Sequence, residues 1–265
     1  MRNIKTLLLL FSILCFGTEA LADAICVDGI YYNINQSEKT AEVTRGNYGT
    51  NTTCIVIPAS FSYQNNTYTV TSIGQDAFSY YSKLTSVYIP NTVTSIGKKA
   101  FYSSGLISFN IPNTVTSIGE SAFVDCRELT SVNIPNSVTS IGKSAFSGCR
   151  SLTSVNIPNS VTSIENRMFF RCYSLTSVNI PNTVTNIGED AFYECRELTS
   201  LTIPNSVTDI GNNAFYGCSR LTSIVIPNSV TSIKNNTFAY CSNLISIIIP
   251  NSVISIENNA FHDCN

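Results

Sequence analysis

Residues 129–151 read L-T-S-V-N-I-P-N-S-V-T-S-I-G-K-S-A-F-S-G-C-R-S, and this 23-residue unit decides the fold. Similar units follow one another along the chain. Every proline follows an isoleucine, and from Pro112 to Pro250 a proline recurs at every 23rd position. A fixed period between about 20 and 50 residues is typical of solenoids, whereas propeller blades need about 40. The sequence therefore predicts a leucine-rich repeat solenoid, a stack of short parallel strands.

The first half of the unit has the pattern of one short strand. Leu129, Val132 and Ile134 are apolar and alternate with Thr, Ser and Asn, so we expect the apolar set to point inward and the polar set outward. Pro135 ends the strand, because proline has no N–H to donate to a neighbouring strand. Asn and Ser then make a turn.

The second half of the unit returns the chain across the core. Val138 and Ile141 are expected to pack inward, as a second short strand. Ala145–Phe146 is expected to pack inward from a single helical or 3₁₀ turn. Gly142 has the character of a residue with positive φ. Glu165 occupies the equivalent place in the next unit, which argues against a strict requirement.

The N-terminal segment, residues 1–22, has the pattern of a signal peptide. Arg2 and Lys5 form a basic start, and Leu7–Phe16 is a ten-residue apolar run. The small residues Ala20 and Ala22 then form a cleavage site, so we expect the mature chain to begin at Asp23. The apolar run is too short to span a bilayer, and no later segment has 18 consecutive apolar residues, so no transmembrane span is expected in the mature chain.

Two further parts are expected after the signal peptide. Residues 23–53 form an N-terminal capping hairpin. Residues 54–265 form a solenoid of about nine units, each 22 or 23 positions long and the last of them incomplete. Residues 60–69 are extra to the first unit, and we expect them to form a hairpin-like excursion.

The repeat resembles a known family. The frame L-T-S-V-x-I-P-N-S-V-T-S-I-G-x-x-A-F-x-x-C, which extends from Cys54 to Asn265, is similar to the BspA-like leucine-rich repeats of bacterial surface proteins. Val27–Ile34, followed by Thr40–Thr44, resembles the β-hairpin that begins many such proteins. The resemblance implies a secreted or surface-anchored protein with an adhesive or binding role. It transfers no binding residue, because the ligands of the family are diverse.

Composition excludes several classes of function. Among 265 residues, charged residues make up 12% and the net charge is −2, which argues against binding to nucleic acid or to an anionic membrane. The single histidine makes a metal site improbable, and no cofactor is expected. His262, Asp263 and Cys264 have the residue types of a thiol nucleophile and its helpers. Adjacent residues rarely converge on one point, so we expect no enzyme.

The cysteines fall into two groups. Seven recur at the same place in the repeat: Cys126, Cys149, Cys172, Cys195, Cys218, Cys241 and Cys264. Their spacing of 23 does not fit a zinc site, whose paired ligands lie two to four residues apart. Disulfides between neighbouring units are conceivable, but we favour buried thiols. Cys26 and Cys54 flank the N-terminal hairpin instead and are candidates for a disulfide.

The outward positions of the strand form the candidate binding surface. The fifth place of the frame holds Tyr88, Asn110, Asn133, Asn156, Asn179, Thr202, Val225 and Ile248, and Ile245 replaces the usual Thr at the second place. This face is uncharged, rich in hydroxyls and amides, and apolar toward the C-terminus. It could bind a ligand, or its side chains could simply hydrogen-bond to one another and to water. Both interpretations remain open.

Two functions follow from these observations. The first is a secreted or surface binding or adhesion module that contacts an extracellular protein or glycan through the concave face. The alternative is a structural segment of a longer surface array with no ligand of its own. The apolar residues Ile245 and Ile248 near the C-terminal end also predict self-association.

Overall fold

The computed structural model describes residues 24–264, and all regular structure in that range is β-strand. Strands of the N-terminal part are β1 (Ile25–Val27), β2 (Ile30–Asn35), β3 (Thr40–Val43), β4 (Cys54–Val56), β5 (Ser60–Tyr63) and β6 (Asn66–Ile73). The longer strands of the repeats are β7 (Ser86–Tyr88), β9 (Ser108–Asn110), β11 (Ser131–Asn133), β13 (Ser154–Asn156), β15 (Ser177–Asn179), β18 (Ser223–Val225) and β20 (Ser246–Ile248). The shorter strands are β8 (Ser95–Ile96), β10 (Ser117–Ile118), β12 (Ser140–Ile141), β14 (Ser163–Ile164), β16 (Asn186–Ile187), β17 (Asp209–Ile210), β19 (Ser232–Ile233) and β21 (Ser255–Ile256).

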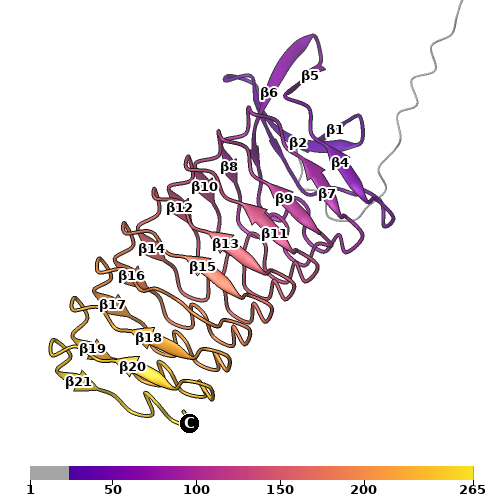
Figure 1. The fold of residues 1–265 in the computed structure, drawn as a ribbon. Coiled ribbons are helices and arrows are strands. Elements are labelled where there is room, and N and C mark those ends of the chain that lie inside the picture. The colour runs from indigo at the N-terminus through magenta and orange to yellow at the C-terminus, as the bar shows by residue number, and fades with distance from the viewer. Residues whose placement is uncertain (1–23, 265) are drawn as a thin grey trace, which may run out of the picture.

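Each repeat forms one coil, and the coils stack into an elongated rod (Figure 1). The three-residue strands lie along one side and the two-residue strands along another. Neighbouring coils pair in parallel at the repeat spacing, so that Ser131 lies opposite Ser108 and Asn133 opposite Asn110. The predicted leucine-rich repeat solenoid is confirmed.

The core is a set of side-chain columns that extend along the rod. Leu129 and Phe146 are fully buried, and Val132 and Ile134 are nearly so. The phenylalanine column, from Phe78 to Phe261, stacks ring on ring with centroids 5.3–5.9 Å apart. A single coil buries too little apolar surface to fold alone, so this stacking is what stabilises the ordered chain.

The expected helical turn around Ala145–Phe146 is wrong. Two left-handed residues, Ser144 (φ 57°) and Gly148 (φ 72°), flank the pair, and such residues interrupt a right-handed helix. The segment is a succession of turns instead. Alternate N–H groups bond to the next coil, as Phe146 N does to Met168 O at 3.0 Å. Those between them bond to the carbonyl three residues earlier, as Ser147 N does to Ser144 O at 3.1 Å. The inter-coil bonds therefore take up some of the N–H groups that a helix would have bonded within the segment.

Gly142 has no positive φ, so the reason for glycine is different from the one expected. A Cβ there would lie 2.5 Å from the backbone nitrogen of Glu120 in the preceding coil. Pairing of the short strands stops between β12 and β14, beside Glu165, and between β17 and β19, beside Lys234. Both interruptions fall where a side chain takes the place of the glycine, whereas at Glu257 the pairing and the bond to the preceding coil persist.

The N-terminal part is a small antiparallel unit attached to the first coils. Strands β1, β2 and β3 pair antiparallel, and β3 joins β6 in parallel. The extra residues at 60–69 lie in the hairpin β5–β6, whose turn is made by the left-handed Gln64 and Asn65. The domain boundaries and the number of units stay predictions. The signal peptide at 1–22 lies outside the described residues.

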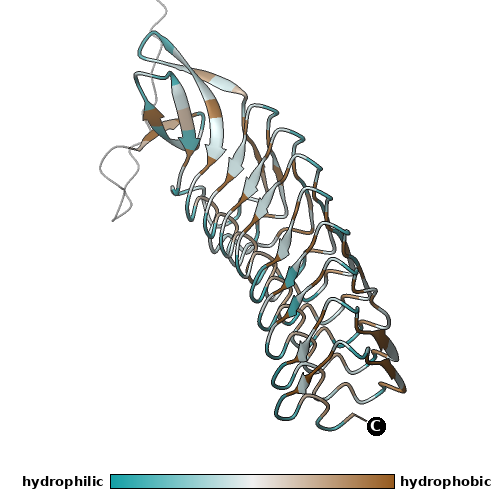
Figure 2. Cartoon of the chain, turned by 90° about the vertical axis from the view of Figure 1, so that its left-hand side faces the viewer, coloured by the Kyte–Doolittle hydropathy of each residue, from teal (hydrophilic) through white to brown (hydrophobic). Residues whose placement is uncertain are grey.

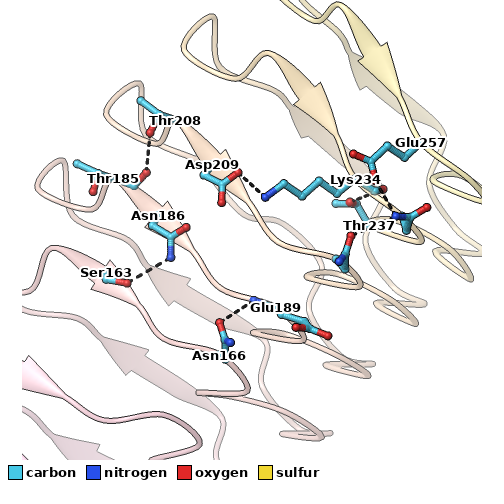
Figure 3. A network of polar contacts seen from close by, with 12 residues as sticks. Ser163, Asn166, Thr185, Asn186, Glu189, Thr208, Asp209, Lys234, Thr237 and Glu257 are labelled. Atoms are coloured by element: carbon cyan, nitrogen blue, oxygen red, sulfur yellow. Dashed lines mark hydrogen bonds and ion pairs between the residues drawn. The ribbon is translucent and has the colours of Figure 1, made fainter.

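Polar side chains on the short-strand side bond from coil to coil (Figure 3). Asn186 Nδ2 donates to Ser163 Oγ at 3.4 Å, and Lys234 Nζ lies 2.6 Å from Asp209 Oδ1.

Candidate functional site

The predicted binding residues lie along one surface, which we call the strand face. It comprises the outward side chains of β7, β9, β11, β13, β15, β18 and β20 and of the intervening segment Ser200–Thr202. In these strands the middle residue points inward, and the end residues are largely exposed. The repeat thus brings together residues that are 23 positions apart in the sequence.

Several polar side chains of the strand face make hydrogen bonds to groups of the neighbouring coil. Asn133 Nδ2 donates to Asn110 Oδ1 at 3.3 Å, and Asn179 Nδ2 donates to Asn156 Oδ1 at 2.9 Å. At the second place of the frame, the Thr130 hydroxyl donates to the Ile107 carbonyl at 3.0 Å, and other units repeat this bond. These contacts correspond to one of the two interpretations that the sequence left open, in which the outward side chains hydrogen-bond to one another.

The sheet of the strand face is interrupted after β15. The sheet β9-β11-β13-β15 ends there, and Ser200–Thr202 makes only an isolated bridge, from Ser200 to Ser223 in the next coil. A cleft of about 530 Å³ opens at the interruption and is lined by Asn179 and Thr202 among others. Its size lies within the usual range of about 300–1,000 Å³ for ligand sites. Two of the predicted residues therefore line this open cleft.

Sequence reasoning did not predict this cleft. Ser177 and Ser200, which also line it, belong to an invariant serine column of the repeat and do not stand out in the sequence. One signal was available: Leu201 stands at the fourth place, where the neighbouring units have the β-branched Val178 and Ile224. β-Branched residues favour strands, and leucine does so less.

The C-terminal part of the strand face is apolar (Figure 2). The exposed fractions are 55% for Val225, 85% for Ile245 and 58% for Ile248. Val225 is exposed even though β20 is paired with its strand, so its exposure results from its outward direction. Apolar side chains gathered on a surface commonly mark a contact site.

The seven cysteines of the repeat are thiols with a defined role. Each Sγ donates to a phenylalanine carbonyl of a preceding coil, as Cys149 does to Phe123 O at 3.2 Å. Burial raises the pKa of Cys126 to about 12. Burial also raises the pKa of the other six, which disfavours the reactive thiolate. Cys26 and Cys54 lie at exposed positions of β1 and β4, and the disulfide between them stays a prediction.

The trio His262, Asp263 and Cys264 does not form a catalytic arrangement. His262 Nε2 lies 3.6 Å from Asp263, whereas Cys264 Sγ donates to the Phe238 carbonyl at 3.1 Å and belongs to the thiol column. Burial raises the pKa of Cys264, which disfavours the nucleophilic thiolate. Within residues 24–264, no cluster of three His, Cys, Asp or Glu residues could hold a metal ion, and no helix could cross a membrane.

Comparison with known proteins identifies the repeat. Residues 58–176 and 162–265 match the model of the BspA type leucine rich repeat region (6 copies). The chain belongs to the BspA-type leucine-rich repeat family. No curated protein matches it.

Solved leucine-rich repeat structures are similar to different degrees. A leucine rich cell surface protein from Faecalibacterium prausnitzii is 36% identical, with a TM-score of 0.74 over 91% of this chain and 74% of that chain. A leucine-rich repeat protein from Bacteroides ovatus is 24% identical, with a TM-score of 0.42 over 91% and 92%. The leucine-rich repeat protein of T. pallidum is 21% identical, with a TM-score of 0.44 over 88% and 85%.

Proposed function

We propose that the chain is a non-catalytic binding module, exported to the cell surface or beyond, that contacts an extracellular protein or glycan through the strand face. The observation that carries this proposal is the cleft beside Asn179 and Thr202. There the pairing between neighbouring strands stops, so backbone groups join the amide and hydroxyl side chains as hydrogen-bonding partners.

The apolar end of the strand face supports the same proposal. Val225 and Ile248 lie side by side across the paired strands β18 and β20 and expose more than half of their surface. Export is supported by the order of basic, apolar and small residues at positions 1–22. It is also supported by the cell-surface relative from Faecalibacterium prausnitzii.

The alternative is a structural segment of a longer surface array. The asparagine pairs and threonine hydroxyls that bond along the strand face favour it, because groups that satisfy one another need no ligand. The two functions predict different outcomes when the strand face is altered.

A binding comparison separates them. The full chain is screened against a surface panel of purified extracellular proteins and oligosaccharides. The screen is repeated with Thr202→Tyr, which fills the cleft, and with the pair Val225→Asn and Ile248→Asn, which removes the apolar patch. The binding module predicts that at least one variant loses a partner while its thermal unfolding is unchanged. Identical binding profiles for all three proteins would favour the structural role.

A further inference from the structure

Two clefts lie away from the strand face, on the side where the chain turns after each buried phenylalanine. The first has a volume of about 400 Å³ and is lined by Tyr80, Asp125 and Arg127 among others. The second has a volume of about 520 Å³ and includes Tyr240, Glu194 and Arg196. Both volumes lie within the range of small-ligand sites.

The two clefts are built from equivalent positions of the repeat. Tyr80 and Tyr240 each stand two residues after a buried phenylalanine. Asp125 and Glu194 occupy that same place in other coils, and an arginine follows each of them two residues later. The chain thus presents the same chemical groups at two places along the rod.

In each cleft the arginine is held by its carboxylate. Arg127 Nε lies 3.3 Å from Asp125 Oδ1, and Arg196 Nη2 lies 2.7 Å from Glu194 Oε1. The Arg196 guanidinium also stacks on Tyr173 at 4.7 Å. A fixed guanidinium keeps unused N–H groups available for a ligand, since it has five donors in a rigid fork.

The tyrosines occupy backbone positions that tyrosine does not favour. Tyr80 has φ 67° and Tyr240 has φ 60°, which is the left-handed region. A residue with a Cβ adopts this region less readily than glycine does. At the same place Asp125, Arg171 and Glu194 are left-handed as well, with φ of 55–56°, and Gly148 and Gly217 occupy it in two coils, so this conformation belongs to the repeat. Both rings are largely accessible, with Tyr80 66% exposed and Tyr240 41% exposed, although each has an aromatic neighbour, Tyr102 at 5.2 Å and Tyr216 at 5.0 Å.

Small residues between the large ones create the clefts. Ser103 and Gly105 separate Tyr80 from the Asp125–Arg127 pair, and Gly217 and Ser219 separate the Glu194–Arg196 pair from Tyr240. Each cleft therefore has an aromatic wall, a wall with a carboxylate and a guanidinium, and a small polar floor.

We propose that these two clefts are binding sites for neutral sugar units of a glycan. A sugar ring has one face of C–H groups, which are attracted to the negative face of an aromatic ring, and a rim of hydroxyls, which both donate and accept hydrogen bonds. The tyrosine ring would pack against the C–H face of the sugar. The carboxylate and the guanidinium would hydrogen-bond to its hydroxyls. The lining of the first cleft has one more carboxylate than guanidinium, owing to Glu128, which disfavours an anionic sugar there. In the second cleft Arg171 also bonds to Glu194, at 2.9 Å, and balances the carboxylate of Asp263.

Two sites on one rod would act together on a glycan-coated surface. Binding at the second site becomes intramolecular once the first is occupied, so weak single-site affinities combine into firm attachment. The sites lie outside the strand face. This proposal can therefore fail while the proposed function of the strand face holds, and the strand face can fail to bind a partner while these sites bind sugar.

The test is a titration of the full chain with neutral oligosaccharides of glucose, galactose, mannose and N-acetylglucosamine, beside sialylated and sulfated counterparts. Calorimetry is expected to detect a neutral sugar that binds at two sites. Tyr80→Asn and Tyr240→Asn each remove one ring and place there a residue that tolerates the left-handed region. Each variant is expected to weaken binding at its own site by roughly tenfold or more, so that the measured stoichiometry falls from two to one. The double variant is expected to leave no detectable site.

Two matched variants keep the result interpretable. Tyr88→Asn removes an exposed tyrosine of the strand face and is expected to leave sugar binding unchanged. Ser242→Trp fills the second cleft while Tyr240 stays in place, and it is expected to remove that site alone. The proposal is overturned if no neutral sugar binds, if the double tyrosine variant binds as wild type does, or if only a peptide or an anionic sugar occupies the clefts.

Discussion

Truncation of one ring in the phenylalanine column provides a quantitative test of the packing. Phe169 is fully buried, and its ring stacks on Phe146 at 5.9 Å and on Phe192 at 5.5 Å. Phe169→Ala removes the ring from a site that the two neighbouring rings hold open. We expect a loss of roughly 3–5 kcal/mol in the free energy of unfolding, which includes the cost of the cavity.

The matched control is Asn156→Ala on the strand face. Asn156 is exposed, and its Oδ1 accepts one hydrogen bond from Asn179, so the change is expected to stay within about 0.5 kcal/mol. With a urea slope of about 3 kcal/mol/M, the midpoint falls by roughly 1–1.7 M for Phe169→Ala and by less than about 0.2 M for the control. Equal midpoints, followed by circular dichroism, would refute the inward column.

Four further predictions concern other parts of the chain. Gly142→Ala is expected to lower the thermal midpoint, because its Cβ meets the backbone of Glu120, whereas Ser147→Ala nearby is expected to have little effect; similar midpoints would contradict the close approach. Alkylation of the unfolded, unreduced mature chain is expected to add seven groups by mass spectrometry, one for each cysteine of the repeat, and fewer would mean cross-linked coils. N-terminal sequencing of the exported chain is expected to begin at Asp23, and a retained Met1 would rule out cleavage. In sedimentation, the full chain is expected to associate and the pair Ile245→Thr and Ile248→Asn to associate less; a chain that stays monomeric at high concentration would exclude self-association.

Periodicity accounts for the success of the fold prediction. A strict repeat places each apolar position above its counterpart, so inward columns such as that of Phe146 follow from spacing alone. The turn around Ala145–Phe146 could not be predicted, because its conformation depends on N–H groups that bond to the next coil. Gly142 was misinterpreted for a related reason: the constraint comes from the backbone of the preceding coil and not from its own φ.

The candidate site was predictable only in part. The alternation of apolar and polar residues predicted that Asn179, Thr202 and Val225 share one surface. The cleft depends on an interruption of the sheet, and the one sequence feature that accompanies this interruption is Leu201. The turn-side clefts depend on residues from several coils. Their tyrosines and carboxylates share one position of the repeat but occur in different coils, so only the stacked structure reveals which of them line one cleft.

Every proposal made for this chain depends on residues one repeat apart lying side by side, and a cross-linking experiment tests this directly. Asn110 and Asn133 are paired across β9 and β11, so cysteines at both places have a separation suited to a disulfide. Thr130 lies three residues from Asn133, roughly 10 Å along the strand. Cysteines at 110 and 130 are therefore too far apart to form a disulfide. Mass spectrometry after mild oxidation is expected to show a bond in the 110/133 variant and none in the 110/130 variant. A bond in the mismatched variant, or none in the matched one, would contradict the in-register stack.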